Sequence, residues 1–128
     1  MTEVAFTIPA MRLRNIANVR WHWSQRARHA SAQRMAARMW ASRALAGRSP
    51  VGDLVVTITR IAPRAMDSDG AVIAAKHVRD GVADALGLDD GDRRLTWHVV
   101  QRRGEPRQHA VAVTMAGDFR DAVAAKVG

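Results

Sequence analysis

Cysteine is absent from the 128 residues of the chain. Its absence excludes disulfide bonds, thiolate metal sites and a cysteine nucleophile. Long apolar runs are missing as well: none approaches the roughly 20 residues of a membrane span, and the N-terminus lacks the basic and then apolar pattern of a secretory signal. We therefore expect a protein of the cytoplasm without a membrane partner.

Acidic residues are missing from a long early stretch, because none lies between Glu3 and Asp53. The stretch contains nine arginines: Arg12, Arg14, Arg20, Arg26, Arg28, Arg34, Arg38, Arg43 and Arg48. Charge of one sign attracts a polyanion, and a guanidinium group can donate two parallel hydrogen bonds to a phosphate. A solvated helix face would have the same composition, so both interpretations stay open.

The size and composition indicate one folded domain over residues 1–128. Hydrophobic residues make up 48 % and charged residues 25 %, with four prolines. These values are typical of a globular domain with one modest core. The formal net charge is +8, from 18 arginines and two lysines against 12 acids.

The first part of the chain predicts a strand and a helix. Residues 4–9 suit a strand that Pro9 ends, and residues 11–28, rich in Arg and Trp, suit a loop or irregular arm. A helix is expected over residues 31–45, with Ser31 as its N-cap. Its expected buried stripe is Ala32, Met35, Ala36 and Met39, with Trp40 beside them.

The second part predicts a strand over residues 54–61 and a helix over residues 71–86. Strands are then expected over residues 95–102 and 109–115, paired as an antiparallel hairpin, followed by a helix over residues 120–126. The order is β-α-β-α-β-β-α, which corresponds to an α+β (α/β) domain with a mixed sheet packed against helices.

Alternation and helical spacing identify the faces of these elements. The residues that we expect to share a face are Leu54, Val56 and Ile58, opposite Val55, Thr57, Thr59 and Ile61; Ala71, Ala75, Val78, Val82 and Leu86 on one helical face; Leu95, Trp97 and Val99, opposite Thr96 and His98; and His109, Val111, Val113 and Met115.

The acids are concentrated around the second helix. Seven of the twelve lie in one window: Asp67, Asp69, Asp80, Asp84, Asp89, Asp90 and Asp92. Carboxylates packed together repel, and a bound cation relieves the repulsion; ligands that are all oxygen favour Mg²⁺ or Mn²⁺ over zinc. For Asp69 alone, an N-cap role explains the residue equally well.

Lys76 lies on the same expected helix side as Asp80 and Asp84. Lys76 and Asp80 have the spacing of an exposed i,i+4 ion pair, worth ~0.3–0.5 kcal/mol. If this side borders the acids, Lys76 could instead hold a phosphate or an attacking water, and spacing alone does not separate the two roles.

Several other motifs are excluded. Gly70 follows Asp69 too early for an EF-hand loop. Pro63 interrupts the strand that an aspartyl-nucleophile phosphatase would need directly before its DxD. No serine lies in a GxSxG-type elbow, and the five histidines lack metal-ligand spacing.

The combination of acids and arginines favours phosphodiester hydrolysis on a nucleic acid. A basic surface collects the polyanion, and metal ions polarise the scissile phosphate and generate a nucleophilic hydroxide.

The acidic window resembles the signature of RusA-type Holliday-junction resolvases. The segment DSDGAVIAAKHVRDGVADALGLDDGD is similar to their order of DxDN, a lysine, DAL and a DD pair. TRIAPR before it, RLTWHVVQRRG after it, and an NxxxxWxxRxR-like stretch (Asn18, Trp23, Arg26, Arg28) extend the resemblance over most of the chain. Gly70 stands where the family has Asn, and Ile73 stands at the usual place of its lysine.

The resemblance implies a homodimer that binds four-way DNA junctions and nicks two strands symmetrically with Mg²⁺. The implied catalytic residues are Asp67, Asp69, Asp90 and Lys76. The implied metal ligands are Asp67, Asp69 and Asp90, with Asp89 beside them. The candidate DNA-binding residues are Arg20, Trp23, Arg26, Arg28, Arg34 and Arg64.

Two further hypotheses stay open. One is a DNA-binding protein of the same fold that cleaves weakly or not at all, and the second is an enzyme for other branched DNA. Trp21 and Trp23 can stack on bases or pack on the protein, whereas helical spacing favours packing for Trp40.

Overall fold

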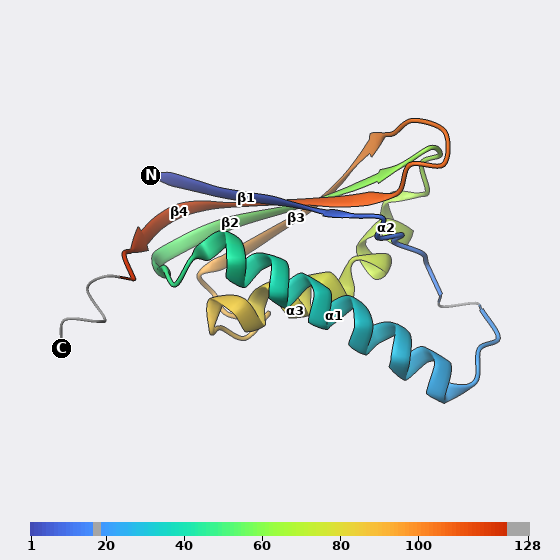
Figure 1. Ribbon diagram of the computed structural model, residues 1–128, viewed down its shortest axis with the longest axis horizontal. Helices are drawn as coiled ribbons and strands as arrows, with labels where there is room; N and C mark the ends of the chain where they lie inside the picture. Colours follow the sequence, from blue (N-terminus) through green and yellow to red (C-terminus); the bar gives the residue numbers. More distant parts are fainter. Residues whose placement is uncertain (17–18, 123–128) are drawn as a thin grey trace.

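The computed structural model describes residues 1–16 and 19–122, and it contains a four-stranded sheet and three helices in this part of the chain (Figure 1). The elements, in order, are β1 (Thr2–Pro9), α1 (Trp23–Leu45), β2 (Ser49–Ala62), α2 (Ser68–Ala74), α3 (Lys76–Leu86), β3 (Leu95–Arg103) and β4 (Ala110–Arg120). The predicted fold class is confirmed: helices pack on a mixed sheet.

The sheet has the strand order β1-β4-β2-β3, and the helices lie on one of its faces (Figure 1). Strand β2 is central: Val56 pairs with Met115 of the antiparallel β4 and with Trp97 of the parallel β3. The predicted hairpin of β3 and β4 is therefore wrong. Both strands pair with β2, which is long and apolar enough to serve two neighbours, and so they lie on its opposite sides.

The predicted strand faces are confirmed. In β2, the side chains of Leu54, Val56 and Ile58 are fully buried, and Val55 on the other face is 40 % exposed. The same alternation buries Leu95 in β3 and Met115 in β4. The core thus lies between the sheet and the helices.

Helix α1 begins eight residues before the predicted start. His22 is its N-cap, and the Gln25 side chain accepts a hydrogen bond from the His22 backbone N–H, which completes a capping box. The prediction of a loop through residue 28 is thus wrong beyond His22, and Ser31 is not the N-cap. Histidine is an unusual capping residue, which is why the sequence pattern did not reveal this start.

The buried stripe of α1 differs from the predicted one. The buried residues are Gln33, Ala37, Ala41 and Leu45. Met35 and Met39 are 60 % and 59 % exposed, while Trp40 packs partly against the core as expected. Small residues, Ala37 and Ala41, form the middle of the stripe, and α3 approaches α1 closely there: a Cβ atom at Gly81 would lie 2.8 Å from the Ala37 Cβ.

The second predicted helix is confirmed with a break. Helices α2 and α3 meet at Ala75, and the predicted stripe from Ala71 to Leu86 is buried. Gly87 ends α3 in the left-handed conformation at φ 71°, as glycine allows. The N-cap is Asp67 rather than Asp69, because α2 begins at Ser68.

The prediction of a C-terminal helix over residues 120–126 is wrong for residues 120–122, which the structure describes. Arg120 is the last residue of β4, and no helix covers residues 120–122; residues 123–128 lie outside the described part. None of the helices in the described ranges combines the length and apolar character that crossing a membrane demands.

Substitution of Gly81 tests the contact between α1 and α3. We expect Gly81→Ala to lower the free energy of unfolding by about 2 kcal/mol, because the added methyl meets the Ala37 side chain and the Arg34 carbonyl oxygen. The gain of about 1 kcal/mol from helix propensity is smaller than this cost.

Urea unfolding measures the change. Gly91→Ala is the matched control, because a Cβ atom at Gly91 meets open space, and it should shift stability by less than about 0.5 kcal/mol. Equal stability of the Gly81 variant and the wild type would contradict the close packing.

Candidate functional site

The two acids of the DxD motif lie at the start of α2, just after the C-terminal end of β2. Asp67 is exposed, and its Oδ2 atom accepts a hydrogen bond from the Gly70 backbone N–H at 3.2 Å. Asp69 lies in the first turn and is also exposed. Both carboxylates are stabilised by the positive end of the helix dipole, and both are accessible to a ligand.

Gly70 lets other groups approach this turn closely. A Cβ atom at Gly70 would lie 2.8 Å from Asp67 Oδ1 and 3.3 Å from Asn15 Nδ2. The Asn15 amide, from the segment after β1, therefore lies beside the Asp67 carboxylate. A side chain at position 70, such as the Asn of RusA-type proteins, would displace one of these groups.

Asp90, in the segment after α3, is held by Arg79 of α3 and Trp97 of β3. Its Oδ2 atom lies 3.8 Å from Arg79 Nε, and its carbonyl oxygen accepts a hydrogen bond from Trp97 Nε1 at 2.9 Å. The Arg79 guanidinium in turn stacks on the Trp97 ring at 5.1 Å. Asp90, Arg79 and Lys76 line a shared hollow of about 280 Å³ with Val72 and Ile73.

The polar side of α3 is present as predicted, but its acids pair with basic residues. Asp80 lies 3.9 Å from Lys76 Nζ, the expected i,i+4 pair. Asp84 accepts two hydrogen bonds from Arg34, from Nε at 2.7 Å and from Nη2 at 2.9 Å. The bonds from Arg34 lower the pKa of Asp84 and raise that of Arg34.

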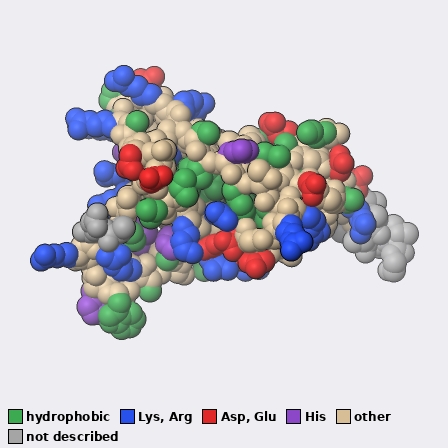
Figure 2. Space-filling view, turned by 180° about the vertical axis from the view of Figure 1, so that it is seen from behind, with side chains coloured by type: hydrophobic (Ala, Val, Ile, Leu, Met, Phe, Trp, Pro, Cys, Tyr) green, Lys and Arg blue, Asp and Glu red, His purple; other side chains and the backbone are tan. Residues whose placement is uncertain are grey.

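The acids of the window do not converge on one point. No group of three or more Asp, Glu or His side chains in residues 1–16 and 19–122 is arranged to hold a metal ion. Asp67 and Asp69 lie at the start of α2, whereas Asp89 and Asp90 follow α3 and lie near Asp84. On the face that Figure 2 shows, acidic side chains lie in several separate groups.

The candidate DNA-binding residues differ in their surroundings. Arg26 donates hydrogen bonds to the carbonyl oxygens of Ile16 and Val19, so it fastens the segment before α1. Arg34 is bound to Asp84, as described above. The others are exposed: Arg20, Trp23, Arg28 and Arg64. Contact of these residues with DNA stays a prediction.

An arginine that the sequence reasoning missed lies on the core face of the sheet. Arg60 follows Leu54, Val56 and Ile58 in the alternation of β2, and it is only 8 % exposed. Its guanidinium group donates to the Gln101 side chain, which also bonds both backbone groups of Met66. The signal was present, because the period of two places this cation at an inward position.

Comparison with protein-family models gave no match for this chain, and a search of the curated proteins gave none either. Membership of the RusA-type family therefore stays a prediction that rests on the resemblance of the motifs.

Two histidines meet where α1 faces α3. The rings of His29 and His77 lie 6.3 Å apart, and Trp21 contacts His29 edge-on at 5.2 Å. Burial lowers the pKa of both histidines; for His29 the neighbouring His77 and Arg14 lower it further. For His77, Asp80 opposes the effect of burial, while Lys76 and Arg34 add to it.

The histidine pair predicts a loss of stability in mild acid. Because the folded pKa of each histidine is below the unfolded value of about 6.5, the unfolded chain binds more protons as the pH falls below that value. We expect the free energy of unfolding to be highest above about pH 7 and to decrease through pH 6 and 5.

Urea unfolding at several pH values measures this dependence. His77→Gln should flatten the slope between pH 7 and 5, and His98→Gln, on the exposed face of β3, should leave it as in the wild type. An unchanged slope in the His77 variant would contradict the assignment.

Proposed function

We propose that the protein is a Mg²⁺-dependent endonuclease that cuts four-way DNA junctions by paired nicks, as its resemblance to RusA-type resolvases implies. The observation that carries the proposal is the position of Asp67 and Asp69. Their exposed carboxylates lie at the start of α2, close to a cluster of arginines at the end of the sheet that includes Arg60 and Arg64. Acids accessible to a metal beside cations suited to phosphate are what phosphodiester cleavage requires.

Two exposed carboxylates fit the way in which Mg²⁺ is commonly bound, by one or two carboxylates together with waters and substrate phosphate oxygens. A bound ion would polarise the scissile phosphate and supply a hydroxide nucleophile. Asp67 and Asp69 would hold it, and manganese could replace magnesium. Lys76, which lines a hollow together with Asp90, would hold a phosphate of the DNA strand.

A dimer would supply the two sites that symmetric nicks need. The sheet face opposite the helices is uncovered (Figure 1), and Val55 and Val100 on it are 40 % and 44 % exposed. Thr57, Thr59 and Thr114 lie on the same face, so its central part offers an uncharged surface on which a second copy could pack. The proposed place of action is the cytoplasm of a bacterial cell.

The second candidate is a DNA-binding protein of the same fold that does not cleave. Two observations favour it: Arg34 and Arg79 already neutralise Asp84 and Asp90, and the described residues form no group of three metal ligands. The basic body of the protein would then bind branched DNA without cutting it.

Cleavage of a labelled four-way junction separates the candidates. With Mg²⁺, the wild type should give paired nicks in the junction and leave linear duplex intact, and EDTA should abolish the cuts. Asp69→Asn should reduce the rate roughly hundredfold or more, because even groups that only support a metal ligand contribute 10- to 100-fold.

Asp118→Asn is the control for the cleavage assay. Asp118 is an exposed acid at the end of β4, and its substitution changes the net charge equally without touching α2. Tight junction binding by the wild type without any cut in Mg²⁺ or Mn²⁺ would refute the nuclease and favour the binding protein.

Light scattering tests the dimer. The wild type should have twice the mass of the chain, and Val100→Lys should shift it to the monomer, because an unpaired ammonium group is costly to bury. Met35→Lys, on the exposed side of α1, should remain a dimer. A monomeric wild type in the presence of junction DNA would exclude this interface.

A further inference from the structure

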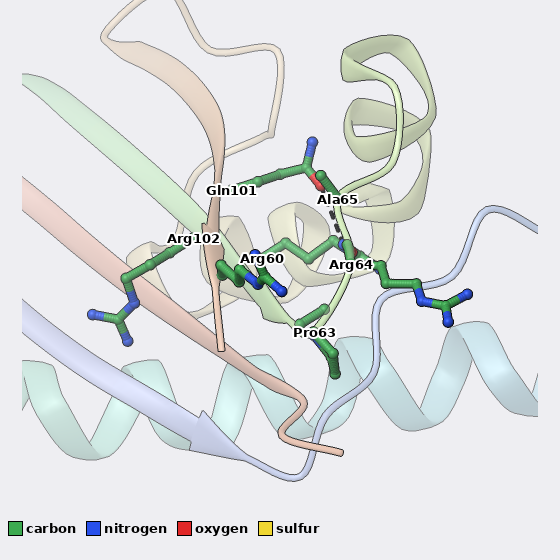
Figure 3. Close-up of a pocket in the computed structure, with 8 residues that line it drawn as sticks. Arg60, Pro63, Arg64, Ala65, Gln101 and Arg102 are labelled. Atoms are coloured by element: carbon green, nitrogen blue, oxygen red, sulfur yellow. Dashed lines mark hydrogen bonds between the residues drawn. The ribbon is translucent and has the colours of Figure 1, made fainter. Parts of the chain in front are cut away.

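A hollow lined by basic residues lies where β2 and β3 end, before α2. One part, of about 420 Å³, is lined by Arg60, Arg102 and Arg103 together with Gln101 and residues 62–65 (Figure 3). A second part, of about 280 Å³, shares Arg60 and Arg64 and adds Arg12 and His109. We name the two parts together the arginine hollow.

The charge of the arginine hollow has one sign. The residues that line its two parts include five arginines and one histidine and no acid: Arg12, Arg60, Arg64, Arg102, Arg103 and His109. None of these six forms an ion pair with an acid of the described residues. The hollow therefore lacks a counter-charge from the surrounding protein, which a ligand would have to supply.

Arg60 is the fixed centre of the hollow. Its Nε donates to the Leu13 carbonyl oxygen at 3.1 Å, and its Nη1 donates to the Arg64 carbonyl oxygen at 2.8 Å and to Gln101 Oε1 at 3.1 Å. All three acceptors are neutral, and within the described residues no partner occupies Nη2. Figure 3 shows Arg60 between Gln101 and Pro63, with the Arg64 and Arg102 side chains extending in opposite directions.

Burying a guanidinium group with neutral partners alone is unfavourable. Burial lowers the pKa of Arg60, and the nearby Arg12 lowers it further. A charge that is 8 % exposed and lacks a counter-ion destabilises the fold, and an anion that binds beside it would offset this cost. Arg64, Arg102 and Arg103 are exposed at the edge of the hollow and add positive charge around it.

The arginine hollow is also linked to the acidic turn. Gln101, which accepts from Arg60, donates to the Met66 carbonyl oxygen at 2.7 Å and accepts from the Met66 N–H at 2.9 Å. Met66 directly precedes Asp67. An anion at Arg60 would thus lie at a fixed place relative to the start of α2. A DNA phosphate next to the scissile phosphate would occupy such a place.

We infer that the arginine hollow binds a backbone phosphate of the DNA strand, with Arg60 as the preorganised donor and the exposed arginines completing the contact. The anion site follows from the hollow and from the fact that Arg60, in its centre, forms no ion pair with a described acid. Its assignment to DNA rests on the proposed function.

The test measures binding of a fluorescent four-way junction in EDTA, so that neither metal nor cleavage contributes. Arg60→Gln should weaken binding roughly tenfold, the lower end expected for a hydrogen bond to a charged group. It should also reduce the slope of log K against log salt by about one. Arg93→Gln removes the same charge in the turn before β3 and should change binding less than twofold.

A second variant and a second ligand test the inference even if the Arg60 variant does not fold. Arg64→Gln combined with Arg102→Gln leaves the buried hydrogen bonds intact and should also weaken binding about tenfold. Inorganic phosphate should raise the melting temperature of the wild type above that in chloride of equal ionic strength, and this rise should shrink in both variants.

Junction binding by the folded variants at the strength of Arg93→Gln would overturn the inference. Failure of the wild type to bind any junction would instead refute the proposed function. In that case, phosphate could still raise the melting temperature of the wild type and not that of the two variants. This result would overturn the assignment to DNA and identify a site for free phosphate.

Discussion

The parallel pairing of β2 and β3 determines where the polar residues lie. Parallel neighbours cannot be joined by a tight turn, so the chain must return along the sheet through α2 and α3 before β3 begins. The start of α2 consequently lies near the C-terminal ends of both strands, while the segment after α3 leads back to their other ends. Acids that are close in sequence, Asp69 and Asp90, thus belong to different parts of the crossover. The same geometry places the end of β2, with Arg60, next to the first turn of α2.

The acids of the window serve largely as partners for the arginines. Four of the seven form ion pairs, and their basic partners are Arg34, Lys76, Arg79 and Arg94. Arg34 comes from α1, in the stretch without acids, so this pairing joins the basic and acidic halves of the sequence. Asp67 and Asp69 are different, because both are exposed at a helix start and neither forms an ion pair with a described residue. They are the acids with which the proposed chemistry is concerned.

Much of the fold could be predicted because strands and helices leave periodic signals. The residues that the alternation placed with Leu54 in β2 and those of the stripe from Ala71 to Leu86 are all buried, although Ile61 on the opposite face of β2 is buried too. The stripe of α1 was wrong because its sequence does not reveal the close approach of α3 at Gly81, which buries Ala37, while Met35 is exposed. Strand order was not encoded locally, since β3 and β4 have the same pattern whether they pair with each other or with β2. The inward position of Arg60 could have been derived from alternation. Its neutral hydrogen-bond partners could not, because Leu13 and Gln101 are distant in sequence.

The strand order also has a consequence for how the chain folds. No strand of the sheet pairs with a neighbour through a hairpin, and Val4 of β1 pairs with Met115 of β4. During synthesis, β1 has no partner in the sheet until β4 has left the ribosome, and β2 lacks one of its two partners until then. Closing such long loops before any strand contact forms costs entropy and slows folding. The helical pair α1 and α3 is complete earlier, so its contact at Gly81 can form while β1 still exposes an unpaired edge.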